Sequence, residues 1–198
     1  MLRKIVGAAL ALWCLTAVPA FAHVGQGHMA GFVQGIAHPL SGLDHIIAMV
    51  AVGLYASHLG GRNLWLVPFA FIATMIFGGI LGHSGFPLPL VEGCIGLSVV
   101  VMSLAVAAGV KLPTIAAMAL VSLFAVFHGH AHGSEGAELS SFLPYAAGFV
   151  IATASLHFSG IGLGLVLDKF GASPSLALKR AVGVAGALAG VAILSGLF

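Results

Sequence analysis

The sequence predicts an all-α membrane protein in which six transmembrane helices follow a cleaved signal peptide. Hydrophobic residues make up 60% of the 198 residues, and the mean hydropathy is +1.16. Charged residues make up only 6%, whereas a soluble domain typically has about 25%. Apolar segments recur at lengths near the ~20 residues that a membrane-spanning helix needs. This composition excludes an ordinary soluble domain, and the seven scattered basic residues form no patch that would bind nucleic acid.

The first 22 residues have the pattern of a secretory signal. Two basic residues precede an apolar core, and the small-x-small sequence Ala20-Phe21-Ala22 provides a cleavage site. The predicted domains are therefore a signal peptide over 1–22 and a single membrane domain over 23–198. The apolar core is shorter than the ~20 residues of a span, so an uncleaved first helix is the alternative.

Six apolar segments follow the signal, and each is close to the length of one membrane crossing. Their approximate limits are 31–57, 64–82, 88–109, 112–128, 140–167 and 180–198. Glycine pairs four residues apart, such as Gly78 and Gly82, permit close contact between helices in lipid. The six segments therefore predict a compact helical bundle.

Basic residues in the connections predict how the bundle is oriented, because cytoplasmic loops are enriched in Lys and Arg. The connections after the first, third and fifth spans contain Arg62, Lys111, Lys169, Lys179 and Arg180. The other connections, 83–87 and 129–139, contain neither Lys nor Arg. We therefore expect a bacterial inner-membrane protein with both ends of the mature chain in the periplasm, and a cleaved signal requires the same orientation.

A histidine-rich stretch over residues 127–135 contains three histidines and one carboxylate. His128 and His132 are four residues apart, so a helical turn would place both rings on one face. Gly129 and Gly133 make a regular helix less certain, because glycine favours helix ends and turns. Imidazole and carboxylate together bind Ni, Co, Zn or Cu. The alternative is a solvated loop between two membrane helices, and either structure would face the periplasm.

A second group of polar residues lies within the first span. His38, Asp44 and His45 are unusual there, because ionisable groups inside a membrane are costly and often functional. In a straight helix the two histidines would be ~10 Å apart along the axis. Pro39 predicts a break at His38, which could bring them closer. The alternative is that Asp44 and His45 pair with polar groups of neighbouring helices.

Six other residues are weaker candidates for metal binding or for a place on a transport path. They are His23, His28, His83, Glu92, His130 and His157. Glu92 could instead be an interfacial side chain that reaches water, and His157 could be a proton acceptor or a hydrogen-bonded structural residue. The amine next to His23 could chelate a metal only if cleavage occurs after Ala22.

These two histidine patterns resemble the signatures of the HupE/UreJ family of nickel and cobalt permeases. One signature is a histidine, five residues and Asp-His, and the other is Phe-His-Gly-x-(Ala/Val)-His-Gly-x-Glu. The resemblance implies a six-span permease that carries Ni(II) into the cytoplasm for the maturation of hydrogenase or urease. It implies the metal ligands His38, Asp44, His45, His128, His132 and Glu135. It gives no role to His130, which occupies the variable position.

Three alternative functions are compatible with the same residues. One is an intramembrane hydrolase in which histidine and aspartate hold a Zn(II) that activates water. A serine version would use Ser84 with His157 as its base, and a third alternative is a haem-binding subunit. We expect no enzyme and no prosthetic group, with Ni(II) as the transported substrate and Co(II) or Zn(II) as the alternatives. The sequence has no Walker motif, so we do not expect ATP use by this chain.

Overall fold

A computed structural model describes residues 28–136 and 142–197, and these residues form seven helices and no strand. The helices are α2 (His28–Ser41), α3 (Leu43–Leu59), α4 (Asn63–His83), α5 (Val91–Ala108), α6 (Thr114–Gly136), α7 (Phe142–Asp168) and α8 (Ala172–Leu194). Helices α4 to α8 are each long and apolar enough to cross a membrane, and α2 with α3 can form a sixth span bent by 81°. The predicted all-α membrane fold is confirmed. The predicted signal peptide and His23 lie outside the described residues.

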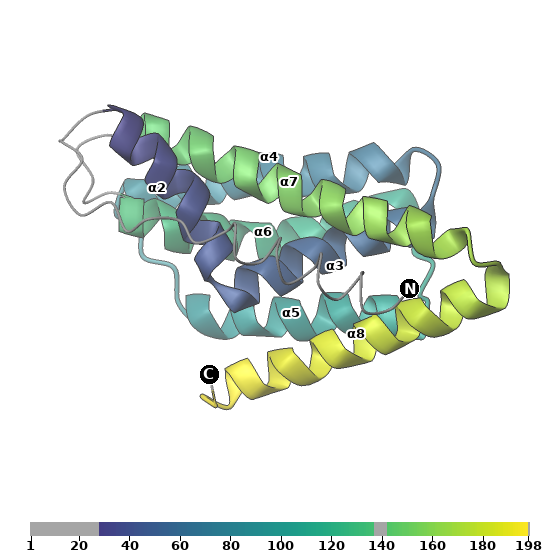
Figure 1. Cartoon of the computed structure of the whole chain (residues 1–198). Helices are drawn as coiled ribbons and strands as arrows, with labels where there is room; N and C mark the ends of the chain where they lie inside the picture. The colour runs from purple at the N-terminus through teal and green to yellow at the C-terminus, as the bar shows by residue number, and fades with distance from the viewer. Residues whose placement is uncertain (1–27, 137–141, 198) are drawn as a thin grey trace, which may run out of the picture.

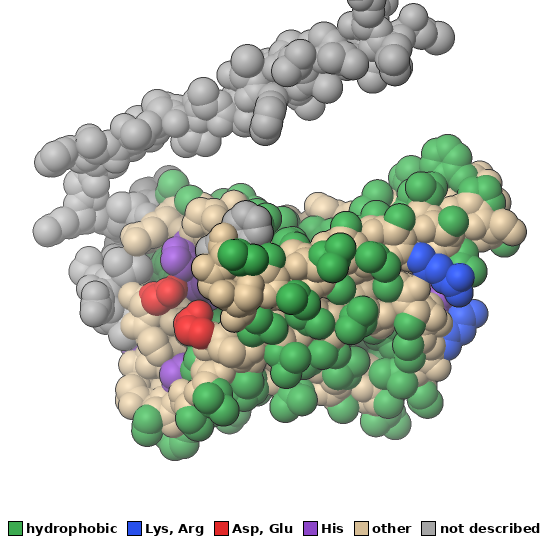
Figure 2. Space-filling model, turned by 90° about the horizontal axis from the view of Figure 1, so that it is seen from below, with side chains coloured by type: hydrophobic (Ala, Val, Ile, Leu, Met, Phe, Trp, Pro, Cys, Tyr) green, Lys and Arg blue, Asp and Glu red, His purple; other side chains and the backbone are tan. Residues whose placement is uncertain are grey.

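The helices pack in close pairs around α3 (Figure 1). Helix α4 lies along α6, α5 lies along α8, and α7 lies along both α2 and α3. Most side chains of α3 between Ala48 and Ala56 are buried. Large apolar side chains such as Trp65, Phe69 and Leu188 are exposed instead, and Figure 2 shows similar side chains over much of the surface in view. The outside of the bundle is therefore suited to lipid.

Glycines allow α4 and α6 to touch backbone to backbone. A Cβ atom added at Gly129 would overlap the carbonyl oxygen of Met75, and one at Gly133 would overlap that of Gly79. Reciprocal overlaps occur at Gly78 and Gly82 on α4. We call this contact the α4–α6 glycine seam. Close contact of this kind replaces the hydrophobic driving force that helices in lipid lack.

The α4–α6 glycine seam corrects two expectations about the histidine-rich stretch. Gly129 and Gly133 do not interrupt the helix, because α6 continues to Gly136. The predicted outer connection over 129–139 is therefore helical up to residue 136. His128 and His130 are buried side chains of this helix. The two glycines serve the packing of α6 and not a turn.

A second set of glycines joins α7 to α2 and α3. A Cβ added at Gly35 or Gly53 would overlap a carbonyl oxygen of α7. One added at Gly148 would overlap a carbonyl oxygen of α2, and one at Gly160 a carbonyl oxygen of α3. We call this contact the α7 glycine seam. It holds both halves of the bent first span against the same helix.

The first span breaks at Gly42, four residues after the predicted position at His38. Pro39 lies inside α2 and removes the N–H that would bond the carbonyl oxygen four residues earlier, yet the helix continues for two more residues to Ser41. The Ser41 hydroxyl donates a hydrogen bond to the carbonyl oxygen of His38 at 2.6 Å. A Cβ at Gly42 would lie 2.8 Å from Oδ1 of Asp44, so a residue without a side chain suits the corner.

The last span begins earlier than predicted. The expected limits were 180–198, with Lys179 and Arg180 in the preceding connection, but α8 already begins at Ala172. Lys179 is buried and donates a hydrogen bond to Oδ1 of Asp168 at 2.7 Å. Ser175 donates to the same oxygen at 2.6 Å. Because its charge is paired, Lys179 is accommodated inside the helix.

Despite this correction, charge remains unevenly distributed between the two ends of the bundle. Figure 2 shows the Lys and Arg side chains together at one end, while the acidic side chains in view lie towards the other. The histidine-rich end of α6 and the start of α5, with Glu92, belong to this second end.

Candidate metal centre

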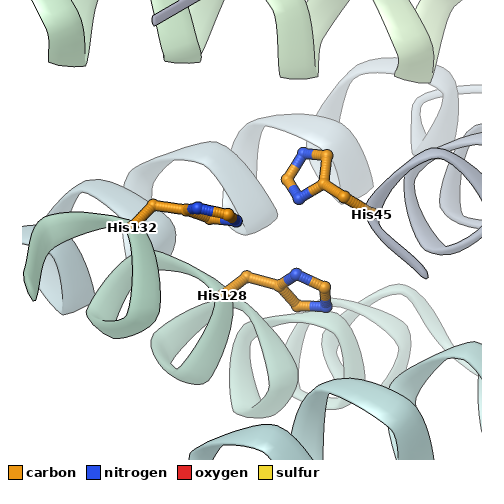
Figure 3. Close-up of side chains that lie close together, drawn as sticks. All are labelled: His45, His128 and His132. Atoms are coloured by element: carbon orange, nitrogen blue, oxygen red, sulfur yellow. The ribbon is translucent and has the colours of Figure 1, made fainter. Parts of the chain in front are cut away.

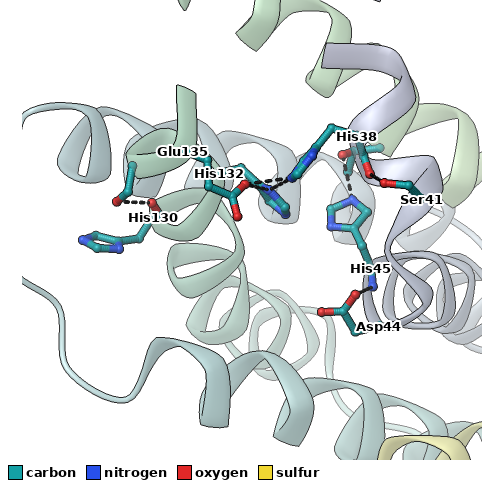
Figure 4. Close-up of polar contacts among 9 residues, drawn as sticks. His38, Ser41, Asp44, His45, His130, His132 and Glu135 are labelled. Atoms are coloured by element: carbon teal, nitrogen blue, oxygen red, sulfur yellow. Dashed lines mark hydrogen bonds and ion pairs between the residues drawn. The ribbon is translucent and has the colours of Figure 1, made fainter. Parts of the chain in front are cut away.

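Three side chains from α2 and the end of α6 converge on one point (Figure 4). Nε2 of His38 lies 3.1 Å from Nδ1 of His132 and 2.8 Å from Oε2 of Glu135. Nδ1 of His132 lies 2.9 Å from the same carboxylate oxygen. His38 and Glu135 are 37% and 53% exposed. We call His38, His132 and Glu135 the open group.

The spacing of these three donor atoms fits one face of a metal coordination sphere. With metal–ligand bonds of ~2.1 Å, adjacent donors of an octahedral ion are about 3.0 Å apart, and those of a tetrahedral ion about 3.4 Å apart. The observed separations of 2.8, 2.9 and 3.1 Å are ordinary hydrogen-bond lengths, and they are also compatible with donors on one face of an octahedral ion. Two nitrogens and one oxygen on one face would leave three positions for water or further ligands.

A second group of possible ligands lies immediately beside the first (Figure 3). His45, His128 and His132 each offer a nitrogen within 4.8 Å of the others. The ring of His45 lies 5.4 Å from that of His128 and 5.3 Å from that of His132, measured between centroids. His45 and His128 are buried. We call these three residues the buried group, which shares His132 with the open group.

Two hydroxyl side chains orient the rings of the buried group. Nε2 of His45 lies 3.2 Å from Oγ1 of Thr153, and Nε2 of His128 lies 2.9 Å from Oγ of Ser98. Nδ1 of both histidines is buried and has no hydrogen-bond partner among the described residues. A metal-binding histidine characteristically has one nitrogen held by a neighbour and the other free for the ion.

The sequence interpretation missed Thr153 and Ser98, although both lie in apolar spans. A polar residue in a span commonly hydrogen-bonds a neighbouring helix, but the sequence does not show which one. Phe149 was missed for the same reason. Its ring packs 4.3 Å from that of His132 and 5.1 Å from that of His45, so it covers one side of the buried group.

Asp44 does not lie in either group, although it is next to His45. Its Oδ1 accepts a hydrogen bond from the backbone N–H of His45 at 2.8 Å, in the first turn of α3. With Glu92 it lines a separate cavity of about 460 Å³ between α3, α5 and α8. A carboxylate at a helix N-terminus offsets the partial positive charge there. The structure thus brings Asp44 and Glu92 to one cavity, whose lining includes no member of either group.

The other candidate histidines belong to neither group. His130 donates from Nε2 to the carbonyl oxygen of Phe86 at 2.7 Å, which fixes the chain after α4. The exposed ring of His83 stacks on Phe142 at 3.7 Å. His157 is buried in α7. His28 begins α2, but its side chain lies outside the described part of the chain.

The geometry does not support the serine-hydrolase alternative. The Ser84 hydroxyl donates to the carbonyl oxygen of Leu81 at 2.9 Å, at the exposed end of α4. His157 is fully buried, and neither of its ring nitrogens has a hydrogen-bond partner in the described ranges. The nucleophile and base therefore do not meet.

Comparison with known proteins agrees with the two signatures. The sequence profile described as "HupE / UreJ protein" matches residues 10–193, nearly the whole chain. The chain belongs to the HupE/UreJ family. This HupE/UreJ protein is 48% identical over 181 residues to Protein HupE of Rhizobium leguminosarum bv. viciae, covering 91% of this chain and 93% of that protein. No solved structure matches it.

Family membership confirms the resemblance found in the sequence. It supports a multi-pass membrane protein that takes part in nickel or cobalt transport, and it is consistent with a protein that is not an enzyme. The zinc-hydrolase alternative is not favoured.

Proposed function

We propose that this protein carries Ni(II) from the periplasm to the cytoplasm, with Co(II) as a second possible substrate, to supply hydrogenase or urease. The observation that carries the proposal is the convergence of three donor atoms in the open group, directly beside the three buried histidines. Nitrogen and oxygen donors without thiolate suit Ni(II) and Co(II). The ion is the transported substrate and not a resident cofactor.

The two groups act as successive binding sites. The open group is partly exposed and can take an ion from water, while His45 and His128 lie deeper in the protein. Because His132 belongs to both groups, an ion can move inward without losing all its protein ligands at once. Each group offers only three ligands, so water completes the coordination and the ion stays exchangeable. Asp44 and Glu92 add negative charge near the entrance and attract cations.

Uptake of radioactive nickel by cells that express the protein tests this function. We expect uptake at limiting nickel concentrations, reduced by excess cobalt and less by excess zinc. A chain carrying both His38→Ala and His45→Ala, which loses a ligand from each group, is the negative control. Equal uptake by the wild type and this control would contradict the proposal.

The orientation can be tested with two matched cysteines in a chain that lacks Cys14 and Cys94. Ser134→Cys lies at the exposed end of α6, and Ser173→Cys lies at the exposed start of α8. If the histidine-rich end faces the periplasm, an impermeant thiol reagent applied to spheroplasts labels the first and not the second. After the membrane is permeabilised, both should react. The opposite labelling in intact spheroplasts would reverse the proposed direction of transport.

A further inference from the structure

His157 is a polar side chain whose placement packing alone does not explain. It is 0% exposed, and neither ring nitrogen has a hydrogen-bond partner among the described residues. Buried polar groups are nearly always hydrogen-bonded, because an unpaired one loses its interaction with water and gains nothing. Leucine would fill a similar volume without that penalty.

The position of His157 places it next to the buried group, one step further into the bundle. It lies four residues after Thr153, the residue that contacts His45. This separation is about one helical turn, or about 6 Å along the axis of α7. This step leads away from the open group and towards the end of the bundle where Lys169 lies. The ring of Phe71 packs against both His128 and His157, with centroid distances of 5.8 and 5.1 Å.

The backbone around His157 is held firmly. The α7 glycine seam brings α3 against this turn, since a Cβ at Gly53 would overlap the carbonyl oxygen of His157. The backbone that carries the imidazole is therefore held by the packing of two helices. A neutral imidazole can bind a transition metal through either ring nitrogen, and both nitrogens of His157 lack a competing partner among the described residues.

We infer that His157 is a further metal-binding station, which takes a divalent transition-metal ion from the buried group on its way to the other side of the membrane. This inference rests on the proposed transport function. A single imidazole binds an ion weakly, and weak binding suits a site that must pass its ion on. His157 thus extends the path from the open group and the buried group deeper into the protein.

Metal binding at this position can be detected without measuring transport. In a chain with Cys14→Ala and Cys94→Ala, His157→Cys places a thiol at the proposed station. Titration of the purified protein with Co(II) should then produce a sulfur-to-cobalt charge-transfer absorption, because a thiolate is a strong ligand. Phe158→Cys is the matched control, since the neighbouring side chain is exposed on the lipid side and should give no such band. Absence of the band in His157→Cys would overturn the inference.

Transport measurements then test whether the station lies on the path. His157→Leu should lower nickel uptake at least tenfold while the affinity of the purified protein for its first Ni(II) ion stays within about twofold, because both outer groups are intact. The midpoint of thermal unfolding should stay the same or rise by about 2–4 °C, since a buried unpaired group is removed. Unchanged uptake by His157→Leu would overturn the inference. If the wild type takes up no nickel, the proposed function itself is wrong, whereas the absorption band still reports on His157.

Discussion

Replacement of His132 with alanine is expected to lower nickel uptake by at least about 100-fold, because changes even to partners of metal ligands cost about 10–100-fold. His132 is the residue shared by the open and buried groups. Its loss removes one of three ligands from each group and also the link between them. His38→Ala and His45→Ala each remove a ligand from one group, so a smaller loss is expected for either.

Initial rates of radioactive nickel uptake at limiting nickel, normalised to the amount of protein in the membrane, provide the measurement. His130→Ala is the matched control. His130 lies on the same helix as His132, but its ring contacts the carbonyl oxygen of Phe86 and belongs to neither the open group nor the buried group. This variant should keep uptake within about twofold, since an isolated hydrogen bond contributes little to the net stability. If His132→Ala transports as well as His130→Ala, neither group binds the transported ion.

Gly133→Ala is expected to destabilise the protein severely, although it changes no possible ligand. The added methyl would overlap the carbonyl oxygen of Gly79 across the α4–α6 glycine seam. Overpacking typically costs about 1–3 kcal/mol when side chains can adjust, and here the obstacle is backbone. We expect the midpoint of thermal unfolding in detergent to fall by at least about 5 °C. Gly129→Ala should lower the midpoint similarly, because its added methyl would overlap the carbonyl oxygen of Met75.

Gly162→Ala is the matched control for the glycine prediction. Gly162 lies within α7, and nothing lies within 4 Å of the Cβ that alanine would add. Alanine in a helix is more favourable than glycine by about 0.5–1 kcal/mol, so this variant should be as stable as the wild type or slightly more so. If all three variants unfold at the same temperature, α4 and α6 are not packed backbone to backbone.

The sequence was sufficient to predict the fold class and the residues that gather at the candidate metal centre. Apolar segments of membrane-spanning length correspond to the helices, since lipid requires satisfied backbone groups within each span. His38, His45, His128, His132 and Glu135 all occur in the two groups. The prediction that they bind metal remains a prediction.

What the sequence could not provide was the identity of neighbours across helices. Gly129 and Gly133 look like helix breakers unless the backbone of α4 is known to lie against them. Lys179 looks like a loop residue unless its pairing with Asp168 is known. Asp44 belongs to the same motif as His45, yet its carboxylate faces a different cavity. In each case the spacing of residues in the sequence indicates one structural role, and the contact with a distant helix shows a different one.

The two glycine seams divide the ligands between two rigid units. The α7 glycine seam joins α2, α3 and α7, which carry His38 and His45, while the α4–α6 glycine seam fixes the helix that carries His128, His132 and Glu135. Backbone packed on backbone leaves little freedom within either unit, so any relative movement of the ligands would occur between the units. An ion bound as we propose would bridge the two units, because each unit supplies some of its ligands. A small tilt of one unit against the other would lengthen several metal–ligand distances at once, so release of the ion and opening of the bundle would be the same event.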